Sequence, residues 1–142
     1  MPTYKVALTV GVFDMLHQGH VELFNKMLDL ADELIVIVHD DYSTFLNKQR
    51  FPVQSLDHRL ENIEKLLQGK VTVVRTYNSN PAAEISFVLH QQVQKYNRTV
   101  VYVRGDDWKD FPGKNTVEGF KVPIVYKEYT EGVSSTKRRS EL

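Results

Sequence analysis

The stretch Val10–His20 reads V-G-V-F-D-M-L-H-Q-G-H and joins two segments with different patterns of apolar residues. The apolar run 6–10 predicts a buried strand, and residues 21–31 carry apolar side chains at helical spacing. A strand that turns directly into a helix leaves backbone N–H groups at the start of the helix, where the helix dipole also favours negative charge. The stretch therefore predicts a strand, a turn and a helix that begins near His17 or Gly19, with an anion site at the turn.

The polar and small residues of this stretch suit an anion site. His17 and His20 are three residues apart, so in a first helical turn they share one face and both rings lean over the site. Gly11 and Gly19 lack a Cβ atom, which permits an unusual backbone angle or the close approach of a ligand. Asp14 either orients Mg²⁺ at the site or caps the N-terminus of the helix.

Strand and helix signals alternate along the rest of the chain. Apolar runs predict strands at residues 34–38, 71–74, 99–103 and 124–126, and helical spacing predicts helices at 57–67 and 82–96, with Gly69 ending the first, and a closing helical turn at 134–141. The segment 39–56 is polar and is interpreted as a loop. This alternation predicts one α/β domain, residues 1–142, built as a Rossmann-like doubly wound sheet of about five parallel strands with helices on both faces.

Candidate ligand-binding residues follow the predicted strands at one edge of this sheet. Gly11 follows the first strand, Asp40 and Asp41 the second, Gly105 and Asp106 the fourth, and Thr130–Thr136 the fifth. In open α/β sheets ligands bind beyond the carboxyl ends of the strands, where the strand order reverses. The predicted topology alone therefore indicates a single ligand site.

Composition excludes several classes of function. The 142 residues are 42% hydrophobic and 25% charged, as in ordinary globular domains with a sizeable core. A formal net charge of +0 provides no general field for binding nucleic acid, and a chain without cysteine has no disulfide or thiol chemistry. No run has the apolar length of a secretion signal or a membrane span, so we expect a cytoplasmic protein that does not insert into membranes.

Three motifs together resemble one enzyme family. They are G-x-F-D-x-x-H-x-G-H at residues 11–20, R-G-D-D-W at 104–108 and T-E-G-V-S-S-T at 130–136. In this order and spacing they resemble the nucleotidylyltransferase superfamily in its cytidylyltransferase form, most closely the branch that acts on glycerol 3-phosphate. The resemblance implies transfer of a cytidylyl group from CTP to a small phosphorylated alcohol, with Mg²⁺ as cofactor, pyrophosphate as product and a homodimer as the assembly.

The resemblance also implies roles for individual residues. It implies catalytic roles for His17, His20, Lys48 and Asp14, with Asp14 as a metal ligand, and substrate contacts from Arg59 and Trp108. It implies nucleotide contacts from Gly11, Val12, Phe13, Gly19, Gly105, Asp106, Asp107, Thr130, Gly132, Ser134, Ser135 and Thr136. Other interpretations stay open: Arg50 competes with Lys48, Arg59 is also typical of an exposed charge on a helix face, and Trp108 of a lid on the core.

The chain departs from the family pattern at Tyr129, where the glycerol-3-phosphate branch carries arginine directly before T-E-G. Tyrosine supplies a hydroxyl group and no charge, and Lys127, Arg138 or Arg139 could replace the missing cation. Alternative acceptors are ethanolamine phosphate, choline phosphate, a sugar phosphate or an inositol phosphate. Alternative functions are an adenylyltransferase acting on a sugar phosphate and a nucleotide-binding module with little turnover; nucleic-acid binding through residues 137–139 ranks third.

Overall fold

The computed structural model of the chain describes residues 2–128 and contains a sheet of five parallel strands. The strands are β1 (Tyr4–Gly11), β2 (Ala31–His39), β3 (Val71–Thr76), β4 (Val100–Gly105) and β5 (Ile124–Lys127). Their order is β3-β2-β1-β4-β5, so the chain builds one half of the sheet outward from β1 and then returns to build the other. The strand order reverses between β1 and β4, which confirms the predicted doubly wound fold.

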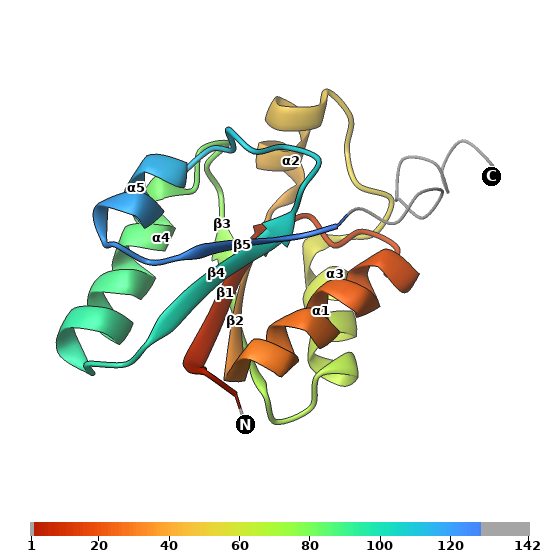
Figure 1. The fold of residues 1–142 in the computed structure, drawn as a ribbon. Coiled ribbons are helices and arrows are strands. Elements are labelled where there is room, and N and C mark those ends of the chain that lie inside the picture. The colour runs from red at the N-terminus through yellow and green to blue at the C-terminus, as the bar shows by residue number, and fades with distance from the viewer. Residues whose placement is uncertain (1, 129–142) are drawn as a thin grey trace.

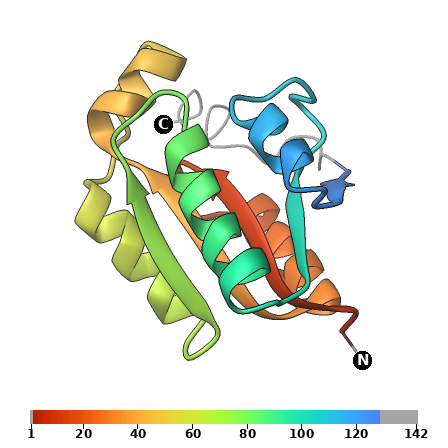
Figure 2. The same ribbon diagram turned by 90° about the vertical axis from the view of Figure 1, so that its left-hand side faces the viewer.

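Helices cover both faces of the sheet, as Figure 1 and Figure 2 show. Helices α1 (Gln18–Leu30) and α3 (Leu56–Leu66) pack on one face; α4 (Ala82–Leu89), which continues into the π-helical turn η1 (His90–Lys95), and α5 (Lys114–Gly119) pack on the other. Strand β2 serves both layers, because Val36 and Val38 lie in the core beneath α1 and α3 whereas Ile35 and Ile37 lie in the core beneath α4 and α5. The unbroken apolar run of β2 is thus buried on both sides, as expected for a central parallel strand.

Helix α2 (Asp41–Lys48) occupies the segment that the sequence analysis interpreted as a loop, and that interpretation is wrong. The Asp40 carboxylate caps the helix by accepting a hydrogen bond from the Ser43 backbone N–H at 2.9 Å. The helix buries the hydroxyl side chains of Ser43 and Thr44 and exposes Phe45. It lies at the carboxyl ends of the strands, beside the ends of β1 and β2, so it forms part of the wall around the expected site (Figure 1).

The other predicted elements are present with small shifts at their ends. Gly69, at a φ of 75°, lies in the turn between α3 and β3, and the predicted helix 82–96 is the combination of α4 and η1. Tyr129, the T-E-G-V-S-S-T motif and the predicted closing turn at 134–141 lie outside the described residues. Within residues 2–128, no helix combines the length and the apolar character that crossing a bilayer requires.

Candidate active site

The turn between β1 and α1 is organised by its two histidines. His17 is the N-cap of α1: its Nδ1 accepts a hydrogen bond from the Gly19 N–H at 3.0 Å, and the His17 N–H donates to Nδ1 of His20 at 3.2 Å. The two rings stack with centroids 4.0 Å apart. Because each Nδ1 accepts a hydrogen bond, the ring proton of each neutral imidazole is on Nε2, so both histidines present an N–H donor at that atom.

This reciprocal cap changes one expectation about the anion site. The sequence analysis expected open backbone N–H groups at the helix start, but those of His17 and Gly19 donate to the imidazoles and that of His20 to the His17 carbonyl oxygen at 3.0 Å. These three amides are therefore already bonded within the turn, and of the two rings it is that of His20 that lines the first lobe. The neutral rings act as hydrogen-bond donors that the cap itself orients.

Phe13 packs against one of the two histidines, His20. Its ring lies 5.5 Å from the His20 ring and 5.3 Å from that of Phe24, which belongs to α1. Phe13 has a φ of 55°, and a Cβ atom at Gly11 would come within 2.8 Å of its ring. Position 11 therefore requires glycine, because any larger residue would displace the aromatic ring that carries His20.

A cleft with two adjoining lobes lies at the carboxyl ends of β1 and β4. The first lobe, about 130 Å³, is lined by Phe13, His20, Thr44, Lys48, Arg50 and Arg104, among others. The second lobe, about 160 Å³, is lined by His39, Asn47, Lys48, Arg104, Asp107 and Trp108, among others. The predicted single site at this edge is therefore divided into two lobes that share part of their lining, including Lys48.

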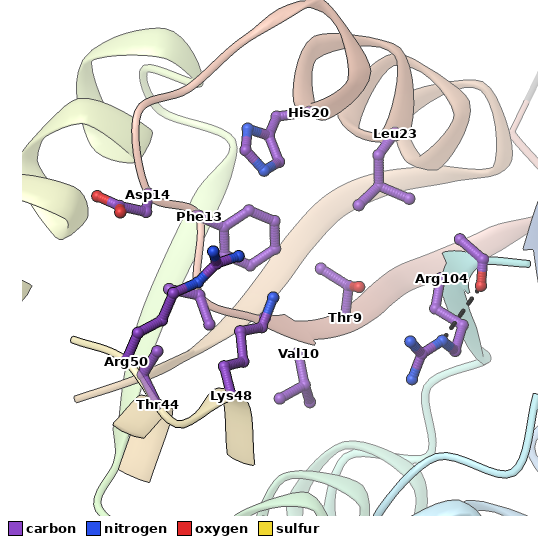
Figure 3. A pocket seen from close by; sticks show the side chains of 13 residues that line it. Thr9, Val10, Phe13, Asp14, His20, Leu23, Thr44, Lys48, Arg50 and Arg104 are labelled. Atoms are coloured by element: carbon purple, nitrogen blue, oxygen red, sulfur yellow. Dashed lines mark hydrogen bonds between the residues drawn. The ribbon is translucent and has the colours of Figure 1, made fainter. Parts of the chain in front are cut away.

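The first lobe is positively charged. Figure 3 shows Lys48 and Arg50 extending into it from one side, His20 facing them from α1, and Arg104 beyond Thr9 and Val10. Burial in the cleft lowers the pKa of Lys48, and the positive charge of Arg50 lowers it further, with Asp107 opposing and Arg104 adding to the effect. An anion placed among these groups would offset their mutual repulsion, so the lobe is suited to phosphate.

The turn after β4 forms the outer wall of the second lobe. The side chains of Asp107 and Trp108 line this lobe, whereas Asp106 is held through its backbone N–H, which donates to the Lys127 carbonyl oxygen at 3.1 Å. Trp108 is 49% exposed, so it is not the packed lid that one interpretation of the sequence allowed. A Cβ atom at Gly105 would approach Asp107 Oδ1 at 2.9 Å, but this oxygen ends a flexible, largely exposed side chain that a small shift would move away.

Asp14 is placed differently from a metal ligand. Its Oδ2 accepts a hydrogen bond from the Val53 N–H at 2.7 Å and its Oδ1 one from the Gln54 N–H at 2.9 Å. Asp14 is 1% exposed and is among the residues that line the first lobe, but its carboxylate is directed toward the segment before α3 (Figure 3). No group of three His, Cys, Asp or Glu residues that could hold a metal ion occurs within residues 2–128. Asp14 therefore does not fit the predicted Mg²⁺ role, and it ties the β1–α1 turn to the segment before α3.

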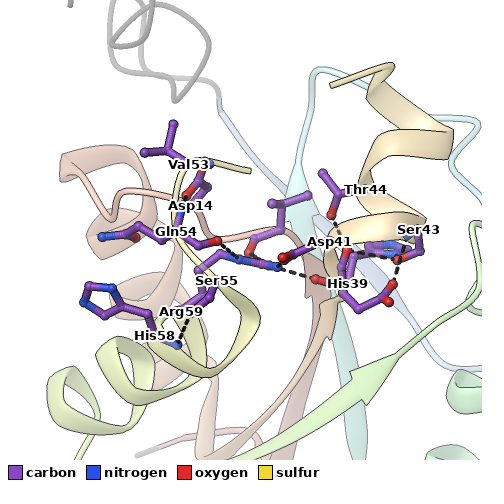
Figure 4. Close-up of polar contacts among 12 residues, drawn as sticks. Asp14, His39, Asp41, Ser43, Thr44, Val53, Gln54, Ser55, His58 and Arg59 are labelled. Carbon is purple, nitrogen blue, oxygen red and sulfur yellow. Dashed lines mark hydrogen bonds and ion pairs between the residues drawn. The ribbon is translucent and has the colours of Figure 1, made fainter. Parts of the chain in front are cut away.

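Arg59 is likewise neither an exposed helix charge nor a substrate contact. It is 0% exposed, and its guanidinium donates to the carbonyl oxygens of Gln54 at 3.1 Å, Val12 at 2.8 Å and His39 at 2.7 Å. It also pairs with Asp41 Oδ1 at 2.7 Å. Figure 4 shows these contacts converging from the β1–α1 turn, the end of β2, α2 and α3. Arg59 is a positioning residue that joins four segments around the cleft.

His39 contributes a neutral imidazole to the second lobe. It is 7% exposed, and its Nδ1 lies 3.0 Å from Ser43 Oγ, which in turn donates to the Asp40 carbonyl oxygen at 3.3 Å. Burial lowers the pKa of His39 from 6.5 to about 4, although Asp40 and Glu84 oppose this shift. The imidazole is therefore uncharged at neutral pH, and it offers hydrogen bonding without adding to the positive charge of the cleft.

The buried His39 predicts a specific loss of stability in acid. The unfolded chain takes up this proton near pH 6.5 and the folded chain near pH 4, so the free energy of unfolding falls as pH drops through that window. The loss attributable to His39 should approach about 2–3 kcal/mol near the lower limit. Urea denaturation at several pH values should show a shallower decline for His39→Asn than for the wild type. The exposed His90→Asn is the control, and equal slopes for wild type and His39→Asn would contradict the assignment.

The structure gathers most of the predicted site residues. Gly11, Val12, Phe13, His20, Lys48 and Gly105 line the first lobe, Asp107 and Trp108 the second, and His17 and Gly19 belong to the cap beside them. Asp14 also lines the first lobe while its carboxylate binds the backbone before α3, and Arg59 lies in the surrounding framework. Thr130, Gly132, Ser134, Ser135 and Thr136 lie outside the described residues. The sequence analysis quoted Arg104 within R-G-D-D-W without giving it a role, and it missed His39 and Thr9. The buried hydroxyl of Thr9 lines the first lobe without a hydrogen-bond partner among residues 2–128. The position of these three residues in the sequence could have identified them, because each lies at or near the carboxyl end of a strand.

Comparisons with known proteins concern the family, the sequence and the fold of the chain. Residues 8–141 match a family model described as cytidylyltransferase-like. The chain is 30% identical to the glycerol-3-phosphate cytidylyltransferase of Bacillus subtilis, with 97% of each chain covered. It is 41% identical to the FAD synthase of Thermococcus sibiricus, over 84% of this chain and 81% of that one. In fold it is similar to a bifunctional NMN adenylyltransferase/ADP ribose pyrophosphatase from Francisella tularensis, with a TM-score of 0.73 at 14% identity, covering 97% of this chain and 41% of that one.

Proposed function

The chain belongs to the cytidylyltransferase-like family of nucleotidyltransferases, and on that premise we propose that it transfers a cytidylyl group from CTP to glycerol 3-phosphate. The products are the CDP-alcohol and pyrophosphate. The observation that supports this most strongly is the His17–His20 pair, whose Nδ1 atoms are fixed by the cap of α1 and whose Nε2 atoms carry the donor protons. His20 lines a lobe that also holds Lys48, so donors and charge suited to a polyphosphate occur together.

The proposed reaction needs positioning and charge neutralisation more than it needs a base. A phosphate oxygen of the acceptor attacks the α-phosphorus of CTP, a P–O bond forms, and the bond to the departing pyrophosphate breaks. The acceptor oxygen is already anionic at neutral pH, so no proton has to be removed. We assign His17 and His20 as donors to the phosphates and Lys48 as the cation that binds them, with the backbone of Gly11, Val12 and Phe13 beside them.

We propose that the turn after β4 reads the base. A carboxylate can accept a hydrogen bond from the cytosine amino group, and of the two candidates Asp107 lines the cleft. Mg²⁺ would enter with the triphosphate as its counterion, because Asp14 already accepts two backbone hydrogen bonds and Mg²⁺ commonly binds through substrate phosphates and water. The resemblance assigns further triphosphate contacts to Thr130, Gly132, Ser134, Ser135 and Thr136.

Adenylyl transfer is the second candidate. The observation that favours it is the 41% identity to a protein named FAD synthase, which exceeds the identity to the glycerol-3-phosphate cytidylyltransferase. The two candidates share the histidine pair and the cationic lobe, so they differ only in base and acceptor. A nucleotide-binding module with little turnover is the remaining alternative from the sequence, and Tyr129 is the residue that permits it.

Pyrophosphate release in the presence of Mg²⁺ tests these alternatives. The purified protein is assayed with CTP or ATP against glycerol 3-phosphate, choline phosphate, ethanolamine phosphate, a sugar phosphate, an inositol phosphate and FMN. Turnover with CTP and glycerol 3-phosphate is the expected result. Turnover with ATP alone would replace cytidylyl by adenylyl transfer, and CTP binding without turnover on any acceptor would favour the binding module. We further expect a homodimer, which light scattering would detect, and a cytoplasmic location.

A further inference from the structure

Arg104 occupies a position that the functional assignments above leave without a role. Both lobes of the cleft are lined by Val10, Gly11, Val12, Lys48 and Arg104. Among these five shared residues only Lys48 and Arg104 are charged. Every other ionisable side chain that lines the cleft, including Arg50 and His39, lines one lobe only.

The α-phosphate of CTP lies between the nucleoside and the departing pyrophosphate. With the pyrophosphate among the cations of the first lobe and the base beside Asp107 in the second, the α-phosphate faces the residues common to both lobes. We propose that Arg104 contacts the phosphoryl group during its transfer and, with Lys48, neutralises the charge on its oxygens. This inference rests on the proposed nucleotidyl transfer and gives a role to Arg104, which belongs to the R-G-D-D-W motif but received no role from the resemblance.

The surroundings of Arg104 hold its guanidinium in place before any ligand arrives. Nε donates to the Gly105 carbonyl oxygen at 3.2 Å, and the guanidinium carbon lies 4.5 Å from the centroid of the Phe111 ring. The Phe111 ring itself stacks on Tyr102 with centroids 5.1 Å apart and 3° between the planes. A planar cation seated on a buried aromatic stack loses little conformational freedom when it binds an anion.

The charge of Arg104 is not cancelled by its nearest carboxylate. Asp107 Oδ1 lies 4.0 Å from Nη2, at the limit of an ion pair, and the Asp107 side chain is 61% exposed while that of Arg104 is 17% exposed. Such a contact contributes little in water. The guanidinium therefore keeps its positive charge for a ligand, and its effect on the pKa of Lys48 indicates that the two cations act on the same region.

The test compares Arg104→Gln and Arg104→Lys with a matched control. The control is Arg98→Gln, because Arg98 also lies over an aromatic ring, 5.0 Å from the Tyr96 centroid, but outside both lobes. Arg104→Gln should lower kcat about 100-fold, and its affinity for CTP should fall by less than about tenfold. Arg104→Lys should retain an intermediate rate. A third variant, Arg104→Ala, should be as slow as Arg104→Gln, and added guanidinium ion should partly restore its kcat. The control should behave as the wild type.

Binding is measured independently of turnover through Trp108. It is the one tryptophan of the chain, and its ring centroid lies 5.9 Å from the Arg104 guanidinium, so its fluorescence reports on CTP in the cleft. A kcat for Arg104→Gln within about threefold of the wild type would overturn the inference and leave the proposed function intact. If the wild type turns over no substrate pair, the proposed function fails separately; unchanged CTP affinity in Arg104→Gln would then overturn the inference, and weakened affinity would retain Arg104 as a phosphate ligand.

Discussion

Replacing His17 by asparagine is expected to lower kcat by about 10²–10³-fold while α1 stays folded. Asparagine is among the best N-cap residues, and its side-chain oxygen can accept the Gly19 N–H hydrogen bond that His17 Nδ1 accepts. It cannot place a donor where Nε2 lies. The substitution therefore separates the two roles of the imidazole, keeping the cap and removing the proposed contact with phosphate.

The measurement is steady-state pyrophosphate release together with thermal unfolding. His17→Asn should unfold within about 3 °C of the wild type, because the cap is preserved. His17→Ala should lose activity to the same extent and also about 1 kcal/mol of stability, because it loses the cap. The exposed His58→Asn is the control for general effects of removing an imidazole. A normal kcat in His17→Asn would show that Nε2 of this residue takes no part in the reaction.

Arg59→Lys is expected to be strongly destabilising although it keeps the charge. The guanidinium serves the carbonyl oxygens of Gln54, Val12 and His39 and the carboxylate of Asp41 from one planar group. An ammonium cannot reach all four, so buried acceptors lose their partners. We expect a loss of about 3 kcal/mol, which lowers Tm by about 10 °C in a domain of this size.

Arg75→Lys is the matched control for this effect. Arg75 pairs with Asp57 at 3.2 Å, but both side chains are largely exposed, so the change should alter stability by less than about 0.5 kcal/mol. Urea denaturation of both variants gives the comparison. If Arg59→Lys were as stable as Arg75→Lys, the four-way contact would not be a significant part of the stability of the fold.

The strands and the long helices could be predicted because apolar periodicity reports directly on burial. Helix α2 could not be predicted in this way, because its buried residues are polar and its apolar ones are exposed. It buries Ser43 and Thr44, whose hydroxyl groups donate to a backbone carbonyl, and it exposes Phe45. A pattern search assigns such a segment to a loop. Helix α5 also escaped prediction, because its six residues include a single buried side chain, Val117, and no side-chain cap.

Position along a strand predicted which residues lie at the candidate site. The sequence did not predict in which direction their side chains point, and for some residues that direction decides the role. The first motif placed His20 and Gly11 correctly in the cleft. The same motif gave no indication that the Asp14 carboxylate accepts a hydrogen bond from the backbone of Val53. Nor did the pattern around Arg59 indicate that this residue lies fully inside the protein. Charged residues are assumed to face solvent unless paired, and their partners here are backbone groups distant in sequence.

The contacts of Arg59 and Asp14 also limit local opening of the segment before α3. Loops around an active site usually open by small local fluctuations, and their amide protons then exchange with solvent much faster than those of the sheet. Here the amides of Val53 and Gln54 donate to the buried Asp14, and the neighbouring carbonyl of Gln54 accepts from Arg59. Releasing this segment requires a buried cation and a buried carboxylate to lose partners together. In hydrogen–deuterium exchange these loop amides should therefore be protected to a degree approaching that of the central strands.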